Sequence, residues 1–148
     1  DCTKDEAVLI NTPAYGYFLH AAEYAGVNVI TSPLRKLADG TFEVDFDDFE
    51  RKCADPRCKL VFWCNPHNPT GRMWTEDELR RAGEIMAKYN LWIVSDEIHE
   101  EFVRLGFQHG LSSLPLCSHP QRPPPHTHGQ GHARLSQAHN LHGAAKDL

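Results

Sequence analysis

The chain has 148 residues, of which 41% are hydrophobic and 24% charged, a composition that fits one modest globular domain. Its formal net charge at pH 7 is -5, and residues 1–103 are more acidic still, with 19 Asp and Glu against 11 Lys and Arg. This acidic balance argues against nucleic acid as a partner, because nucleic-acid binding needs a clustered basic face. No charged n-region followed by an apolar h-region opens the sequence, and no apolar run reaches membrane-spanning length. We therefore expect a cytoplasmic protein with no nucleic-acid or membrane partner.

The cysteines predict free thiols in a reducing compartment. Their number is odd and none of them forms a C-x-x-C pair, which argues against a disulfide scaffold or a structural zinc site. The five are Cys2, Cys53, Cys58, Cys64 and Cys117.

The composition changes abruptly near residue 104. Residues 104–148 hold seven of the ten His and five of the ten Pro, and beyond Phe107 there is no aromatic, Ile or Val residue. Such a segment buries too little apolar surface to offset its ordering entropy. We therefore predict two parts, a folded body over residues 1–103 and a disordered, low-complexity His/Pro-rich tail over 104–148.

The first half of the body reads as strand, helix, strand and turn. Residues 7–10 form a short apolar run that predicts a buried strand, and residues 27–30 predict a second one. Between them, Gly26 supplies a left-handed stop for a helix. The helix is indicated by side chains that recur at three- and four-residue spacing, namely Tyr17, His20, Ala21, Tyr24 and Ala25. Asp39 and Gly40 then mark a turn between extended pieces around Leu37 and Phe42.

The second half of the body repeats the alternation of helix and strand. Asp45 or Asp47 can cap a helix that runs to about Cys53, and residues 59–64 form a continuous apolar strand. A capping box at 75–78 (Thr-Glu-Asp-Glu) starts the next helix. That helix carries an apolar side made of Leu79, Ala82, Ile85, Met86 and Tyr89, and Asn90 can end it before a strand at 91–94.

Strands that alternate with helices predict an α/β fold with a mainly parallel sheet. In such sheets ligands bind beyond the carboxyl ends of the strands. Two polar motifs follow strands at these ends, residues 65–71 (Asn-Pro-His-Asn-Pro-Thr-Gly) and residues 95–99 (Ser-Asp-Glu-Ile-His). The glycine patterns of Rossmann dinucleotide sites and of P-loops are absent from the sequence.

These two motifs, together with residues 12–18 (Thr-Pro-Ala-Tyr-Gly-Tyr-Phe), resemble the large domain of class I/II aminotransferases. The two histidine-containing motifs are similar to those of the cystathionine beta-lyase-like C-S lyase branch of that family. The resemblance covers about residues 5–103. It implies part of the mainly parallel-sheet large domain of fold-type I enzymes and the cofactor pyridoxal 5'-phosphate. In the parent enzyme it further implies an amino-acid substrate and a homodimer.

The resemblance also implies roles for four residues. Asp96 would hold the pyridine nitrogen of the cofactor protonated, and Asn68 would donate its side-chain amide to the phenolate oxygen. His99 stands where many relatives have a tyrosine that contacts the same oxygen. Tyr15 would stack on the cofactor ring. A fifth residue, His67, is expected only to brace the loop.

Each of these residues also has a structural interpretation. Asp96 could cap a helix, and Asn68 could be an ordinary turn residue in an Asn-Pro loop. His67 and His99 could be hydrogen-bonded histidines without a ligand, and Tyr15 could be a core aromatic residue. The order of the three motifs along the chain favours the cofactor interpretation.

The sequence has no legible motif for the lysine that this family joins covalently to its cofactor, so no catalytic residue is identified. Lys146 lies in an unrelated context. The Gly-rich phosphate segment and the domain that carries the substrate-binding arginine are also not found. One hypothesis for the tail is a frame-shifted reading of a lyase gene, because a neighbouring frame permits a segment similar to the family's lysine motif.

Metal binding is the alternative for the tail, through His126, His128, His132, His139 and His142. No orienting scaffold is evident beside these histidines, so no metal site is assigned. A polyproline ligand at 123–125 is a weaker alternative.

Two functions remain open from the sequence. The first is a fragment of a pyridoxal-phosphate-dependent C-S beta-lyase or aminotransferase that acts on amino acids. The second is a non-catalytic α/β fragment without cofactor turnover.

Overall fold

A computed structural model describes residues 5–100 in full and the backbone of residues 139–140. The strands in chain order are β1 (Ala7–Thr12), β2 (Asn28–Pro33), β3 (Arg35–Lys36), β4 (Phe42–Glu43), β5 (Cys58–Cys64), β6 (Trp92–Asp96) and β7 (His139–Asn140). The helices are α1 (Gly16–Ala25), α2 (Phe46–Cys53) and α3 (Glu76–Lys88).

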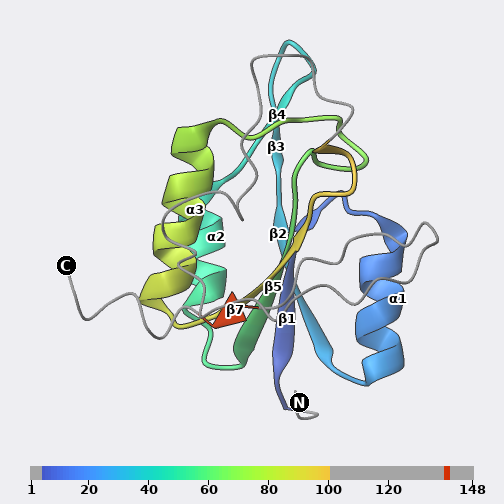
Figure 1. Ribbon diagram of the computed structural model, residues 1–148, viewed down its shortest axis with the longest axis vertical. Helices are drawn as coiled ribbons and strands as arrows, with labels where there is room; N and C mark the ends of the chain where they lie inside the picture. Colours follow the sequence, from blue (N-terminus) through green and yellow to red (C-terminus); the bar gives the residue numbers. More distant parts are fainter. Residues whose placement is uncertain (1–4, 101–138, 141–148) are drawn as a thin grey trace, which may run out of the picture.

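The main sheet has the order β2-β1-β5-β6-β7, and its first four strands are parallel. Figure 1 shows the sheet between α1 on one face and the α2–α3 pair on the other. The predicted α/β fold with a mainly parallel sheet is therefore confirmed. β7 adds a two-residue antiparallel pairing to the edge of β6. Apart from the backbone of these two residues, the tail predicted from residue 104 lies outside the described residues.

The larger apolar core fills the space between the sheet and the α2–α3 face. Phe49 of α2 and Leu79 of α3 are fully buried there against Val61 and Trp63 of β5. Phe49 and Trp63 meet edge to face, with ring centroids 5.6 Å apart. Because alternate side chains of a strand point to opposite faces, the apolar run of β5 supplies both cores, as its continuous hydrophobicity predicts.

Helix α1 packs on the other face through a side that its sequence periodicity did not mark. The buried residues of α1 are Phe18 and Ala22, and the Phe18 ring stacks on Phe62 at 4.9 Å. Tyr17 and Tyr24, which carried the predicted periodicity, are 68% and 96% exposed. The spacing therefore predicts the helix correctly but does not mark its buried side.

The structure contains the helix caps and the turn that the local sequence predicts. Gly26 ends α1 in the left-handed conformation, with φ 68°. Asp45 is the N-cap of α2, and its side chain accepts from the Asp48 amide. Thr75 and Glu78 form both halves of the predicted capping box at the start of α3. The predicted turn at Asp39 and Gly40 joins β3 to β4, which project from the sheet as a small antiparallel hairpin (Figure 1).

Candidate cofactor site at the carboxyl edge of the sheet

The strand order of the main sheet reverses between β1 and β5. From β1 the chain passes through α1 to β2 on one side, whereas β5 lies on the other side of β1. This reversal of strand order is the position where open α/β sheets bind ligands. Residues 13–15 follow β1 and residues 65–71 follow β5, so two of the three sequence motifs lie at the carboxyl ends of these neighbouring strands.

The third motif joins them because β6 lies beside β5. Cys64 and Asp96 are register partners at the carboxyl ends of these two strands. The main-chain N–H of Asn65 donates to the main-chain carbonyl of Asp96 at 2.9 Å. Asp96 is the last residue of β6, so this strand ends two residues later than the strand predicted at 91–94.

The loop that follows β5 is held from inside by residues that the sequence analysis gave no role. Asn65 is buried, and its side-chain oxygen accepts from the Trp74 amide at 3.1 Å. The indole N–H of Trp74 donates to the carbonyl of Cys64 at 2.9 Å. Nothing in the local sequence marks Trp74 as a partner, because its role arises when the chain folds back over the loop.

Arg72 ties the same loop to two other elements. Its guanidinium donates to the carbonyl of Phe42 at 2.9 Å and to both carboxylate oxygens of Glu78 at 2.9 and 3.1 Å. It also lies over the Trp74 ring, 5.3 Å from its centroid. These Arg72 contacts therefore connect the loop to β4 and to the first turn of α3.

His67 braces the loop. It is buried, and its Nδ1 lies 2.8 Å from the Thr70 hydroxyl. Its main-chain carbonyl accepts from the Gly71 amide at 2.7 Å, and Gly71 adopts φ 69° to close the turn. Burial lowers the pKa of His67 to about 4, so its ring is neutral near pH 7.

Asn68 and Asp96 are both half-buried and are linked through one side chain. The Cys64 Sγ accepts from the Asn68 amide at 3.5 Å and lies 3.7 Å from Asp96 Oδ2. Asp96 Oδ1 accepts from the Ile98 amide at 3.2 Å. Within residues 5–100, no hydrogen bond holds the side-chain amide of Asn68, which leaves its donors open to a ligand.

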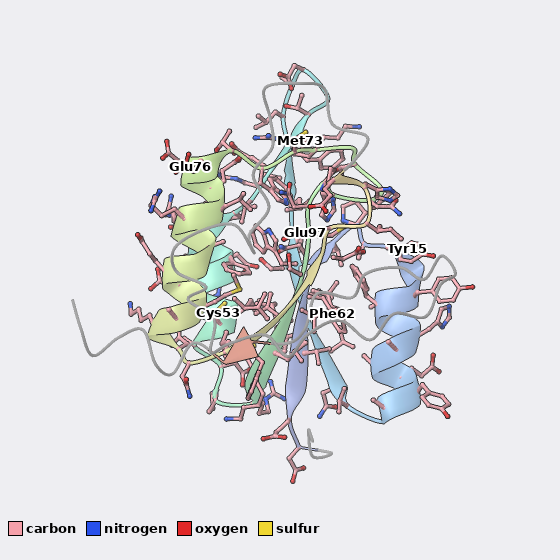
Figure 2. All side chains as sticks on the ribbon, in the orientation of Figure 1. Tyr15, Cys53, Phe62, Met73, Glu76 and Glu97 are labelled. Atoms are coloured by element: carbon pink, nitrogen blue, oxygen red, sulfur yellow. The ribbon has the colours of Figure 1, made fainter. Side chains whose placement is uncertain are left out.

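Tyr15 and His99 lie at the periphery of this arrangement. Tyr15 precedes the first turn of α1 and is 42% exposed, with its ring stacked on Tyr17 at 5.2 Å. Figure 2 shows Tyr15 at the end of α1 that lies level with Glu97, which follows β6. His99 lies in the turn after β6 and is half-buried. Within residues 5–100, the ring contacts of Tyr15 are with Tyr17 and Phe18.

No metal centre or membrane helix is found in the part of the chain that the structure describes. Within it, no three His, Cys, Asp or Glu side chains form a group that could hold a metal ion. None of the helices in these residues is long and apolar enough to cross a membrane. The side chains of the tail histidines lie outside the described residues.

Known proteins match this chain over much of its length. The family model for aminotransferase class I and II matches residues 1–117. Cystathionine beta-lyase PatB of Bacillus subtilis is 38% identical over 104 residues, which are 70% of this chain and 27% of the relative. Protein MalY of Escherichia coli is 41% identical over 98 residues, which are 66% of this chain and 25% of the relative. The chain thus spans about a quarter of the length of these relatives.

Solved structures agree with the sequence relatives. The PLP-bound C-S lyase from Staphylococcus hominis superimposes with a TM-score of 0.69 at 44% identity, over 73% of this chain and 27% of that one. A PLP-bound putative aminotransferase from Clostridium difficile gives a TM-score of 0.66 at 37% identity, over 76% and 27% of the two chains. The sheet order, the placement of the motifs and these matches lead to one conclusion: the chain belongs to the class I and II aminotransferase family.

Proposed function

We propose that this chain forms one wall of a pyridoxal 5'-phosphate site in an enzyme that acts on amino acids, either a C-S beta-lyase of the cystathionine type or an aminotransferase. The observation that carries the proposal is the pairing of Asn68 with Asp96 through Cys64 at the carboxyl edge of the sheet. An unpaired amide and an oriented carboxylate are the groups that a phenolate oxygen and a pyridinium nitrogen need.

The residues fit this cofactor by their chemistry. When bound, pyridoxal phosphate supplies an electron-withdrawing ring that accepts electrons released at the substrate's α-carbon. The carboxylate of Asp96 would hold the proton on the ring nitrogen, because an anion beside a cation favours the charged form. Asn68 would donate its amide to the phenolate oxygen, and His99 would approach the same oxygen.

Tyr15 would cover one face of the ring. Its side chain is exposed and lies shortly after the carboxyl end of β1, and aromatic rings prefer offset stacking. The homodimer of the parent enzyme and a cytoplasmic location are further parts of the proposal. The location is supported by the free, buried thiols of Cys53, Cys58 and Cys64, which suit a reducing compartment.

A specific observation also favours cofactor binding without turnover by this chain alone. Within residues 5–100, the lysines lie outside the two motifs that carry Asn68 and Asp96: they are Lys36 on β3, Lys52 on α2, Lys59 on β5 and Lys88 on α3. A lysine that reacts with the cofactor and moves the α-proton would have to come from another segment.

The test is an equilibrium titration of the full chain with pyridoxal phosphate. Bound cofactor is measured by absorbance and by equilibrium dialysis. We expect saturable binding to the wild type and binding weakened about tenfold or more in Asp96→Asn, since the charge-assisted contact to the ring nitrogen is lost. Asp47→Asn, which changes a 98% exposed carboxylate on α2, is the matched control and should bind as the wild type does. Equal binding by all three proteins would refute the assignment of Asp96.

Product analysis separates the two chemistries. Incubation of a full-length relative with cystathionine-type substrates would release pyruvate and ammonia if the enzyme is a lyase. Amino transfer that requires an added keto acid would identify an aminotransferase.

A further inference from the structure

Cys64 contacts both Asn68 and Asp96 through its sulfur. Its Sγ lies 3.2 Å from the carbonyl of Pro66, 3.5 Å from the amide nitrogen of Asn68 and 3.7 Å from Asp96 Oδ2. The residue is 4% exposed and sits at the last position of β5. Its thiol therefore occupies the space between the loop and the end of β6.

These contacts hold the Asp96 carboxylate in one orientation. Oδ1 is engaged by the amide of Ile98 and Oδ2 faces the thiol of Cys64, so the two oxygens are held from different sides. Each carboxylate oxygen has two lone pairs, so both keep capacity for a further donor. The carboxylate is thus oriented without being saturated.

The same thiol fixes the loop at Asn68. The sulfur accepts from the main-chain N–H of Asn68 and donates to the carbonyl of Pro66 or to Asp96. Because the contact is to the main chain, the side-chain amide of Asn68 keeps its donors for a ligand. One atom therefore touches both the main chain of Asn68 and the carboxylate of Asp96.

The thiol is suited to this position because it stays neutral. Burial, together with the negative charge of Asp96, raises the pKa of Cys64 to about 12, although the hydrogen bond from Asn68 opposes the shift. A neutral S–H faces Asp96 as a weak donor, whereas a thiolate there would repel the carboxylate.

We infer that Cys64 is a positioning residue that fixes the spacing and orientation of Asn68 and Asp96 for the cofactor ring. This inference rests on the proposed function for its purpose, but its geometric content is independent of cofactor binding. A purely structural interpretation treats Cys64 as one more buried thiol, like Cys53 in the core beneath α2. The two interpretations differ in what happens to the Asn68 amide when the sulfur is replaced.

The test compares Cys64→Val, which keeps the approximate volume but has no donor or acceptor, with Cys64→Ser, which keeps both. Amide hydrogen exchange is measured by NMR on the full chain without ligand. We expect Cys64→Val to speed exchange at Asn68 about tenfold relative to Cys64→Ser, because the amide loses its acceptor. Cys53→Ala is the control, since it removes a buried thiol on the other face and should not change the exchange of Asn68 relative to the rest of the chain.

Pyridoxal-phosphate affinity is the second measurement on the same variants. We expect Cys64→Val to bind about tenfold more weakly than the wild type, and Cys64→Ser to restore binding to within about threefold. Unchanged exchange at Asn68 in a folded Cys64→Val protein, or equal losses in the Val and Ser variants, would overturn the inference. If the wild type itself binds no pyridoxal phosphate, the proposed function fails, and the exchange data still decide whether Cys64 positions the pair.

Discussion

The main-chain N–H of Asn65 donates to the main-chain carbonyl of Asp96 at 2.9 Å. This hydrogen bond connects the first residue after β5 to the last residue of β6. The Asn65 side chain meanwhile accepts from the Trp74 amide, which closes the loop from the other side. One buried residue thus connects the end of β6 to the segment that leads into α3.

Replacing Asn65 should destabilise the fold. Asn65→Ala leaves the buried Trp74 amide without its acceptor, and an unsatisfied buried group costs about 1–3 kcal/mol. Urea unfolding followed by circular dichroism measures this loss. Asn28→Ala, at an exposed position on β2, should stay within about 0.5 kcal/mol of the wild type. Equal stability of the two variants would contradict the proposed role of Asn65.

His67 should make stability depend on pH. Its pKa is about 4 in the folded chain against 6.5 in the unfolded chain, so the unfolded state binds more protons between these values. The resulting loss of unfolding free energy is absent well above pH 6.5 and grows as the pH falls. Below pH 4 it approaches its full size of about 3 kcal/mol.

The measurement is the free energy of unfolding of the wild type and of His67→Gln between pH 4 and pH 8. We expect the variant to show a smaller loss of stability on acidification. His20→Gln, at a 73% exposed side chain, should keep the wild-type pH dependence. Superimposable pH profiles for the wild type and His67→Gln would show that His67 is not the group responsible.

Arg72 should resist replacement even by lysine. Its planar guanidinium bonds Glu78 through two oxygens, reaches the Phe42 carbonyl and lies over the Trp74 ring, and an ammonium cannot make these contacts together. We expect Arg72→Lys to lose about 1–3 kcal/mol of unfolding free energy. The exposed Arg80–Glu76 pair gives the control, since Arg80→Lys should change stability by less than about 0.5 kcal/mol. An Arg72→Lys variant with the same unfolding free energy as the wild type would contradict the stabilising role of this network.

The described cysteines should be unreactive in the native protein. Burial raises the pKa of Cys58 to about 11 and that of Cys64 to about 12, and it raises the pKa of Cys53 as well. At pH 8, iodoacetamide should modify these three residues only after denaturation, as peptide mass mapping would show. Rapid native labelling of Cys64 would mean that the thiol is exposed or ionised, contrary to its place between the loop and β6.

Much of the fold could be predicted from the sequence because its signals are local. The capping box at Thr75, the left-handed stop at Gly26 and the continuous apolar run of β5 each act within a few residues, and each predicted its element. The buried side of α1 could not be predicted in the same way. It depends on the contact between Phe18 and Phe62 of β5, which are far apart in the sequence. The aromatic spacing of Tyr17 and Tyr24 marks the exposed side instead.

The candidate site also has parts that local sequence motifs predicted and parts that depend on contacts between distant residues. The motifs predicted which strand ends carry Asn68 and Asp96, and the parallel sheet brings those ends together. The link through Cys64 was not predicted, because it joins residues 32 positions apart and depends on the register of β5 against β6. The roles of Tyr15, Asn68, Asp96 and His99 toward a cofactor stay predictions.

The most direct test of the central claim is a two-dimensional ¹⁵N NMR titration of the full chain with pyridoxal phosphate. If residues at the ends of β5 and β6 form one wall of the site, amide shifts should concentrate in residues 65–69 and 95–98, and Asp96→Asn should reduce them. Binding that leaves these amides unchanged while shifting residues elsewhere, such as those of the β3–β4 hairpin, would contradict the claim.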